Sequence, residues 1–112
     1  MISKKVKWIK IFNSLEELES KFITDNYCLK NVEVDLLLVK TKGEILAFKN
    51  RCPHQNKPLD GCKVKEGRVV CPYHQYTFSI EDGRGHGLYL EKYPIVVRTE
   101  GVFVGVEKWS FF

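Results

Sequence analysis

Two short stretches decide the fold: RCPHQNKPL at residues 51–59 and CPYH at residues 71–74. In each, a proline directly follows the cysteine, and one or two residues separate the cysteine from a histidine. Thiolates and imidazoles are the side chains that soft and borderline metal ions prefer. The pattern therefore predicts two loops that meet around one metal centre. The candidate ligands are Cys52, His54, Cys71 and His74.

The prolines that follow the two cysteines are expected to stiffen these loops before any metal binds. A proline ring fixes its own φ angle and biases the preceding residue toward an extended conformation. Pro53 and Pro72 therefore favour an extended backbone at the two cysteines. The first loop closes with a further proline and Leu59. We expect this leucine side chain to screen the site from water.

Strands are expected to deliver both loops. Residues 32–40 read VEVDLLLVK, a run rich in β-branched residues and leucine, and residues 44–49 return as its partner after a turn at residues 42–43. This hairpin leads directly into the first loop. Residues 68–70 are expected to form a short strand that ends at Cys71. The metal centre is thus predicted at one end of a β structure.

The remaining sequence also alternates between short strands and turn signals. A helical turn is expected at residues 15–22, where Ser14 and Glu17 form a possible capping box. The glycine-rich GRGHG at residues 83–87 is expected to be irregular. Further strands are expected at residues 6–12, 77–80, 95–99 and 102–107. The predicted fold class is all-β: a small sandwich or barrel of stacked antiparallel sheets with at most one short helix.

Length and composition are those of an ordinary globular protein. The 112 residues fit one domain, residues 1–112, and apolar residues make up 44% of them. The net charge of +4 is spread along the chain, so nucleic acid is not an expected partner. The longest apolar run is residues 36–39, so neither a membrane span nor a signal peptide is expected. The expected compartment is the cytoplasm.

The other two cysteines and the third histidine stand outside these loops. Four cysteines would allow two disulfides in a secreted chain, but the paired cysteine–histidine stretches favour metal binding. Cys28 and Cys62 are expected to be free thiols that pack as small apolar residues. His86 is expected to be solvated or locally hydrogen-bonded, and not to bind metal.

Two kinds of metal centre could use two cysteines and two histidines. A single zinc ion takes four such ligands in a tetrahedral arrangement, but structural zinc sites usually pair cysteine with cysteine and histidine with histidine in one loop. Here each loop mixes the two types. A mixed pair in each loop suits a two-iron centre, in which one iron takes both thiolates and the other takes both imidazoles.

At this point the chain resembles Rieske proteins, whose ligand signature is C-x-H followed by C-x-x-H. Further similarities are the proline and leucine that end the first loop, Phe78 four residues after the second histidine, and KYPIVV at residues 92–97. The resemblance covers roughly residues 32–107. It implies a Rieske-type [2Fe–2S] cluster with Cys52 and Cys71 on the inner iron. His54 and His74 would bind the outer iron.

Several positions place the chain within this family. High-potential Rieske proteins carry an additional cysteine in each loop, joined as a disulfide, but this chain has Lys57 and Tyr73 there. They also place serine and tyrosine hydroxyls near the cluster, where this chain has Tyr76 and Phe78. The chain therefore resembles the soluble Rieske ferredoxins that supply oxygenases. One departure is Gln75, which stands where the family commonly has glycine.

The resemblance implies electron transfer. The expected function is that of a one-electron carrier between a ferredoxin reductase and a terminal oxygenase, working as a monomer. An oxygenase of this type also needs a mononuclear iron on two histidines and a carboxylate, and after the cluster is ligated only His86 remains. The chain is therefore not expected to be the oxygen-activating enzyme. The alternative is a Rieske-type small subunit of a larger redox complex, such as nitrite reductase.

Overall fold

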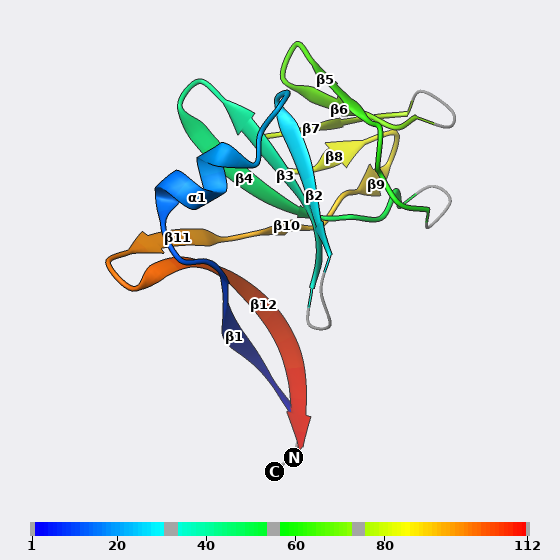
Figure 1. Ribbon diagram of the computed structural model, residues 1–112. Helices are drawn as coiled ribbons and strands as arrows, with labels where there is room; N and C mark the ends of the chain where they lie inside the picture. Colours follow the sequence, from blue (N-terminus) through cyan, green and yellow to red (C-terminus); the bar gives the residue numbers. More distant parts are fainter. Residues whose placement is uncertain (1, 31–33, 54–56, 73–75, 112) are drawn as a thin grey trace.

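The computed structural model describes residues 2–30, 34–53, 57–72 and 76–111, with side chains described between residues 5 and 107. Within these ranges the chain forms antiparallel sheets and one short helix (Figure 1). A four-stranded sheet lies between a long ribbon, which carries both ends of the chain, and a smaller sheet that leads into the candidate ligand loops. The predicted all-β class is confirmed.

The central sheet has the strand order β10-β4-β3-β2 and is buried on both faces. Its strands are β2 (Asn26–Lys30), β3 (Asp35–Thr41), β4 (Glu44–Lys49) and β10 (Lys92–Tyr93). Successive side chains of a strand point to opposite faces. A sheet that is covered on both faces therefore needs a continuous apolar run, and β3 supplies one as LLLV.

Two hydrophobic cores lie on the two faces of this sheet. We call them the ligand-side core and the ribbon-side core. Leu37 of β3 and Phe48 of β4 belong to the first, whereas Leu36 and Leu38 belong to the second. The ligand-side core also contains Val39, Cys52, Leu59, Cys62, Val69, Cys71, Phe78 and Leu90. The ribbon-side core also contains Ile9, Phe12, Leu18, Val34, Ala47, Val102 and Val104.

The ribbon sheet joins the beginning and the end of the chain. β1 (Ile2–Phe12) pairs antiparallel with β12 (Gly101–Phe111), and β11 (Ile95–Arg98) pairs with the other edge of β12. The register runs from Ile2 opposite Phe111 to Phe12 opposite Val102, with an irregularity near the inner end. The ribbon extends beyond the central sheet, and the two termini lie together at its tip (Figure 1).

The helix α1 (Leu15–Ser20) closes the ribbon-side core with Leu18. It begins as expected, because Ser14 Oγ accepts a hydrogen bond from the Glu17 backbone N–H at 3.1 Å. The Glu17 carboxylate, however, accepts from the Asn13 side chain at 3.3 Å. The expected end at residue 22 is wrong: the helix ends at Ser20, and the N–H groups of the next two residues bond carbonyls only three positions back.

The small sheet β5-β6-β7 positions the second candidate loop. It consists of β5 (Lys63–Lys65), β6 (Arg68–Val70) and β7 (Thr77–Ser79), and it packs on the central sheet through Val69 and Phe78. The two-stranded sheet of β8 (Arg84–Gly85) and β9 (Leu88–Tyr89) follows. The expectation that residues 83–87 are irregular is therefore wrong. A Cβ at Gly85 would lie 2.0 Å from the Thr77 carbonyl oxygen, so the glycine lets β8 approach β7 closely.

Three of the hairpins use the same kind of two-residue turn. Their turn residues are Lys42 and Gly43, Glu66 and Gly67, and His86 and Gly87, all with positive φ. Positive φ at both central positions is the type I′ geometry that suits the twist of a two-stranded hairpin. A glycine at the second position relieves half of the strain, because it has no Cβ.

Other strand boundaries differ modestly from the expectations. The strands expected at residues 44–49 and 68–70 are confirmed. The strand expected from residue 32 begins at Asp35, and residues 31–33 lie outside the described ranges. The expected strands 77–80 and 95–99 each end one residue earlier, whereas both ribbon strands are longer than expected. β2 and β5 were not expected.

In the described part of the chain, no helix is long and apolar enough to cross a membrane.

Candidate metal centre

Both candidate cysteine ligands lie in the ligand-side core. Cys52 follows β4 after a short connection, and Cys71 follows directly after β6. Their exposed fractions are 0% and 1%. Figure 1 shows the chain segments after β4 and after β6 on the same side of the molecule. The structure thus brings the two predicted thiol ligands into one apolar core.

The two loops close in the same way. The Cys52 backbone N–H donates to the carbonyl of Lys57 at 2.8 Å, and the Cys71 N–H donates to the carbonyl of Tyr76 at 2.7 Å. Each bond spans five residues, with the cysteine at its start. The two cysteine N–H groups are therefore bonded in the same way, although the cysteines follow strands of different sheets.

The predicted histidine ligands, His54 and His74, lie outside the described residues, as do Tyr73 and Gln75. Within the described residues, no three side chains of His, Cys, Asp or Glu gather around a common point. The described half of the donor set is therefore the pair of cysteines. Leu59 is fully buried in the same core, in agreement with the expectation that it screens the site.

The described half of the site fits an iron–sulfur cluster. Cysteine thiolates hold such clusters, and a dry environment around the sulfurs is one of the properties by which a protein tunes them. Here the two cysteines share one buried core with Phe78, Leu59 and Leu90. All four cysteines lie in described ranges, and none of them forms a disulfide. Both proposed thiol ligands are thus in the form that binds metal on deprotonation.

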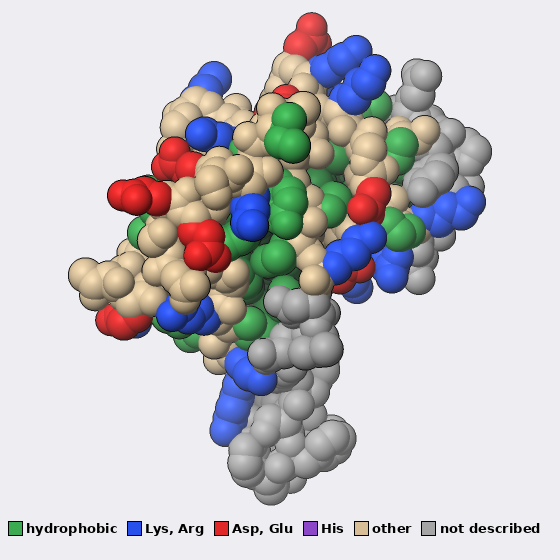
Figure 2. Space-filling view, viewed as in Figure 1, with side chains coloured by type: hydrophobic (Ala, Val, Ile, Leu, Met, Phe, Trp, Pro, Cys, Tyr) green, Lys and Arg blue, Asp and Glu red, His purple; other side chains and the backbone are tan. Residues whose placement is uncertain are grey.

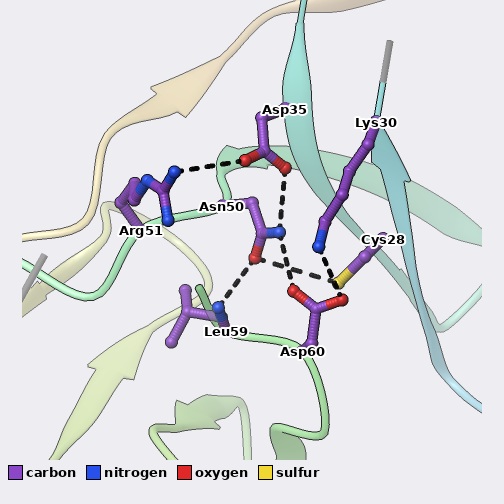
Figure 3. A network of polar contacts seen from close by, with 7 residues as sticks. All are labelled: Cys28, Lys30, Asp35, Asn50, Arg51, Leu59 and Asp60. Atoms are coloured by element: carbon purple, nitrogen blue, oxygen red, sulfur yellow. Dashed lines mark hydrogen bonds and ion pairs between the residues drawn. The ribbon is translucent and has the colours of Figure 1, made fainter. Parts of the chain in front are cut away.

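A buried asparagine, which no sequence motif marks, ties the first loop to the central sheet. Asn50 stands between β4 and Cys52, and its side chain is fully buried (Figure 3). Its Oδ1 accepts the Leu59 backbone N–H at 2.8 Å, across the base of the loop. A lone asparagine before a cysteine carries no sequence signal for such a role. Its partners lie up to 22 positions away in the chain.

His86 lies beside the second loop. Its imidazole Nε2 accepts a hydrogen bond from the Thr77 backbone N–H at 3.2 Å, and its ring stacks on Tyr76 with centroids 4.7 Å apart. The expectation that His86 is locally hydrogen-bonded is confirmed. The bond requires a neutral imidazole with its proton on Nδ1.

Cys28 and Cys62 are thiols whose surroundings disfavour the thiolate. Cys28 is half-buried, and its Sγ lies 3.8 Å from Asn50 Oδ1. Burial, reinforced by the Asp60 carboxylate and opposed by Lys30, raises the pKa of Cys28 from 9.0 to about 11. Burial also raises the pKa of Cys62 to about 12. Both groups are therefore protonated thiols at neutral pH, as expected for cysteines that pack as apolar residues.

Alkylation tests this assignment. Because a pKa raised from 9.0 to about 11 lowers the thiolate population at pH 8 roughly 100-fold, iodoacetamide should label Cys28 about 100-fold more slowly in the native protein than in urea. Cys62 should react more slowly still. Mass spectrometry of the labelled peptides measures both rates. Native and unfolded rates that agree within threefold would contradict the assignment.

Comparison with known proteins identifies the family. Residues 8–94 match the family model described as "Rieske [2Fe-2S] domain". The ferredoxin component of the alkene monooxygenase system of Xanthobacter autotrophicus is 34% identical over 79 residues, which cover 67% of this chain and 65% of that protein. Human apoptosis-inducing factor 3 is 35% identical over 91 residues, but the match covers only 15% of its length. The chain thus spans less than two thirds of these relatives.

Solved structures agree on the fold. The ferredoxin of carbazole 1,9a-dioxygenase from Nocardioides aromaticivorans superposes with a TM-score of 0.69, over 88% of this chain and 96% of that one, at 18% identity. A chain from a complex of reduced oxygenase and oxidized ferredoxin in carbazole 1,9a-dioxygenase gives a TM-score of 0.70, over 87% of this chain and 91% of that one, at 17% identity. The family match extends over most of the sequence, from β1 to β10. The chain therefore belongs to the Rieske [2Fe–2S] domain family, whose cofactor is a Rieske-type [2Fe–2S] cluster.

Proposed function

We propose that this protein is a one-electron carrier whose cluster is held by Cys52, His54, Cys71 and His74. The observation that carries the proposal is the pair of buried cysteines in one core, each of which donates its backbone N–H to the carbonyl five positions later. When bound, the cluster accepts and releases a single electron. The apolar core would keep water from the thiolate end, so exchange with a partner would take place through the loop end that carries the histidines.

We propose an oxygenase system as the setting. Support comes from the relative in the alkene monooxygenase system and from the structural likeness to a chain in an oxygenase–ferredoxin complex. In this setting the protein would receive electrons from a ferredoxin reductase and pass them to a terminal oxygenase. We further propose that residues 1–112 act as one domain, as a monomer in the cytoplasm, without nucleic acid or membrane partners.

The protein is proposed to be a carrier and not the oxygen-activating enzyme. A mononuclear iron site of the oxygenase type needs two histidines and a carboxylate. The sequence has three histidines, and two of them are assigned to the cluster. The third, His86, already uses its Nε2 to accept the Thr77 N–H. The alternative, a small subunit of a larger complex such as nitrite reductase, is less well supported, because such subunits usually lack the ligands that this chain has.

The test is chemical and spectroscopic analysis of the protein purified without added metal. The proposal requires about two irons and two acid-labile sulfides per chain and, after reduction by one electron, the EPR spectrum of a Rieske cluster. One zinc ion per chain without sulfide would contradict it. Size-exclusion mass and copurification then separate a free carrier from a permanent subunit, since the subunit would elute with its larger partner.

The reduction potential should lie in the lower part of the Rieske range, which is roughly −150 to +300 mV. Hydrogen-bond donors to the cluster sulfurs stabilise the added electron and raise the potential. Phe78 is fully buried in the ligand-side core and has no hydroxyl to donate. Voltammetry from pH 6 to pH 10 should give a low potential that changes little around pH 7. A potential near the top of the range, or a steep fall already at pH 7, would contradict this prediction.

Docking of the partner should depend on positive charge beside the ligand loops. Lys57 and Lys63 are exposed and Arg51 is half-buried, and Figure 2 shows basic side chains on the side that carries the small sheet. An acidic partner face would gain association rate from such charges. Lys57→Glu should slow association with the cognate partner about tenfold at low ionic strength, and added salt should reduce the difference.

Lys21→Glu is the matched control for this prediction. It makes the same change of charge at an exposed residue directly after α1. The helix α1 lies on the other side of the molecule from the chain segments that follow β4 and β6 (Figure 1). Stopped-flow electron transfer at several ionic strengths measures both variants. Equal rates for the two variants, or a wild-type rate that ignores salt, would show that these charges do not steer docking.

A further inference from the structure

A polar network lies at the base of the first ligand loop (Figure 3). Its centre is Asn50, which is the one buried polar side chain among the described residues. Burying an amide is unfavourable unless its hydrogen bonds are made within the protein. The position of Asn50, two residues before Cys52, therefore calls for a physical reason.

All the hydrogen-bonding groups of the Asn50 side chain have partners. Nδ2 donates to Asp35 Oδ1 at 2.9 Å and to Asp60 Oδ1 at 3.0 Å. Oδ1 accepts the Leu59 backbone N–H at 2.8 Å, and the Cys28 Sγ approaches it to 3.8 Å. An amide can donate two bonds and accept two, so this side chain is fully used. The partners fix its orientation, because the carboxylates accept only and the Leu59 N–H donates only.

These contacts fasten the first ligand loop at both ends. Asn50 precedes the loop and Leu59 ends it, so the bond between Asn50 Oδ1 and the Leu59 N–H closes the base of the loop. The bond from the Cys52 N–H to the Lys57 carbonyl lies inside this closure. The Asn50 backbone N–H also donates to the Asp35 carbonyl at 3.0 Å, which anchors the base to β3.

The charges around Asn50 favour an amide at this position. The Asp35 carboxylate lies 3.8 Å from the Arg51 guanidinium, and the Asp60 carboxylate lies 3.1 Å from the Lys30 ammonium. The hydrogen bond from Asn50, followed by that from Lys30, holds the pKa of Asp60 below its ordinary value. Asn50 thus donates to two carboxylates, each with a cationic partner. An aspartate at position 50 could not donate and would add a third negative charge.

We infer that Asn50 is a positioning residue of the metal centre: through its bonds to Leu59, Asp35 and Asp60 it holds the loop of Cys52 in the geometry that binds the cluster. This inference rests on the proposed assignment of Cys52 as a ligand. Asn50 acts on the electronic properties of the cluster through the loop, by limiting the arrangements that the Cys52 thiolate can adopt. Partners of metal ligands commonly orient them in this way.

The experiment compares wild-type protein with Asn50→Ala, each with its cluster. Removal of the amide should broaden the EPR features of the reduced cluster, shift the reduction potential at pH 7, and speed the loss of iron to a chelator at least about tenfold. Asn26→Ala is the matched control: the Asn26 amide bonds the Cys62 carbonyl at 3.3 Å, outside the loop, and its removal should leave all three properties unchanged. If Asn50→Ala only lowers the melting temperature and leaves all three at their wild-type values, the inference is wrong.

If Asn50→Ala does not retain the cluster, a second pair of variants tests whether Asn50 positions the loop of Cys52. Asp60 is partly exposed, so its replacement is compatible with folding. Asp60→Asn keeps an acceptor oxygen for the Asn50 amide, whereas Asp60→Ala removes it. Iron loss should be faster in Asp60→Ala than in Asp60→Asn, and equal rates would overturn the inference. A wild-type protein without a Rieske EPR spectrum would instead refute the proposed function, before any variant is compared.

Discussion

Cys52→Ser should yield a colourless protein with less than about one tenth of the wild-type iron and sulfide, because a serine hydroxyl is a poor substitute for a soft thiolate ligand. His74→Ala should have the same effect. Both variants should also unfold at lower temperature, since metal binding at such sites contributes to the stability of the fold. Absorbance, iron and sulfide analysis and thermal unfolding measure these losses.

Cys62→Ser is the matched control for this result. Cys62 is 5% exposed and belongs to the same ligand-side core as Cys52, so the change places the same hydroxyl in the same surroundings. Burial of the hydroxyl should cost about 1–3 kcal/mol of stability in both variants. The colour should be lost in Cys52→Ser but persist in Cys62→Ser. It should also persist in Cys28→Ser and His86→Ala. Full cluster occupancy in Cys52→Ser would refute the ligand assignment.

The second large effect concerns two neighbouring leucines of β3. Leu37→Ala and Leu38→Ala each remove a fully buried side chain and should each lower the free energy of unfolding by about 2–5 kcal/mol. Leu37 packs in the ligand-side core and Leu38 in the ribbon-side core. Only Leu37→Ala should therefore change the EPR spectrum of the cluster and speed its loss. Urea unfolding combined with EPR measures both properties.

Each leucine variant serves as the control for the other, because the residue type, the strand and the burial are the same. A cavity in a packed core is only partly filled by relaxation of its surroundings, so we expect its largest effect among the side chains that line it. An equal change of the EPR spectrum in both variants would mean that the two cores are mechanically coupled. No change in either would mean that the ligand-side core does not shape the cluster environment.

The two cores explain why most strands could be predicted and why the layers could not. The run DLLLV predicted a strand, and β3 indeed includes it. Its lack of alternation reflects burial on both faces, but a short apolar run does not by itself reveal what covers each face. The small sheet was only partly expected, because β5 (KVK) is short and rich in lysine. Such a strand depends on its partner β6 more than on its own propensity.

The candidate site, like the fold, could be predicted only in part from the sequence. The spacing of cysteine and histidine predicted the two loops, and the structure places both cysteines in one core. The role of Asn50 could not be predicted, because its partners come from β2, β3 and the end of the loop. Hydrogen bonds between distant segments leave no local pattern. The GRGHG segment was misjudged because its glycines suggested irregularity, whereas they permit a type I′ turn and a close approach of β8 to β7.

The pairing of β1 with β12 determines the order in which the protein can form during synthesis. The ligand-side core uses residues from Leu37 to Leu90, so it can assemble before the ribosome has added the last strand. The ribbon-side core needs Val102 and Val104 opposite β1, so β1 stays unpaired until β12 has been synthesised. Such pairing between distant segments is slow to form. We therefore expect the ligand-side core to form while β1 is still unpaired, and the lysines of that strand (KKVKWIK) disfavour its aggregation in the meantime.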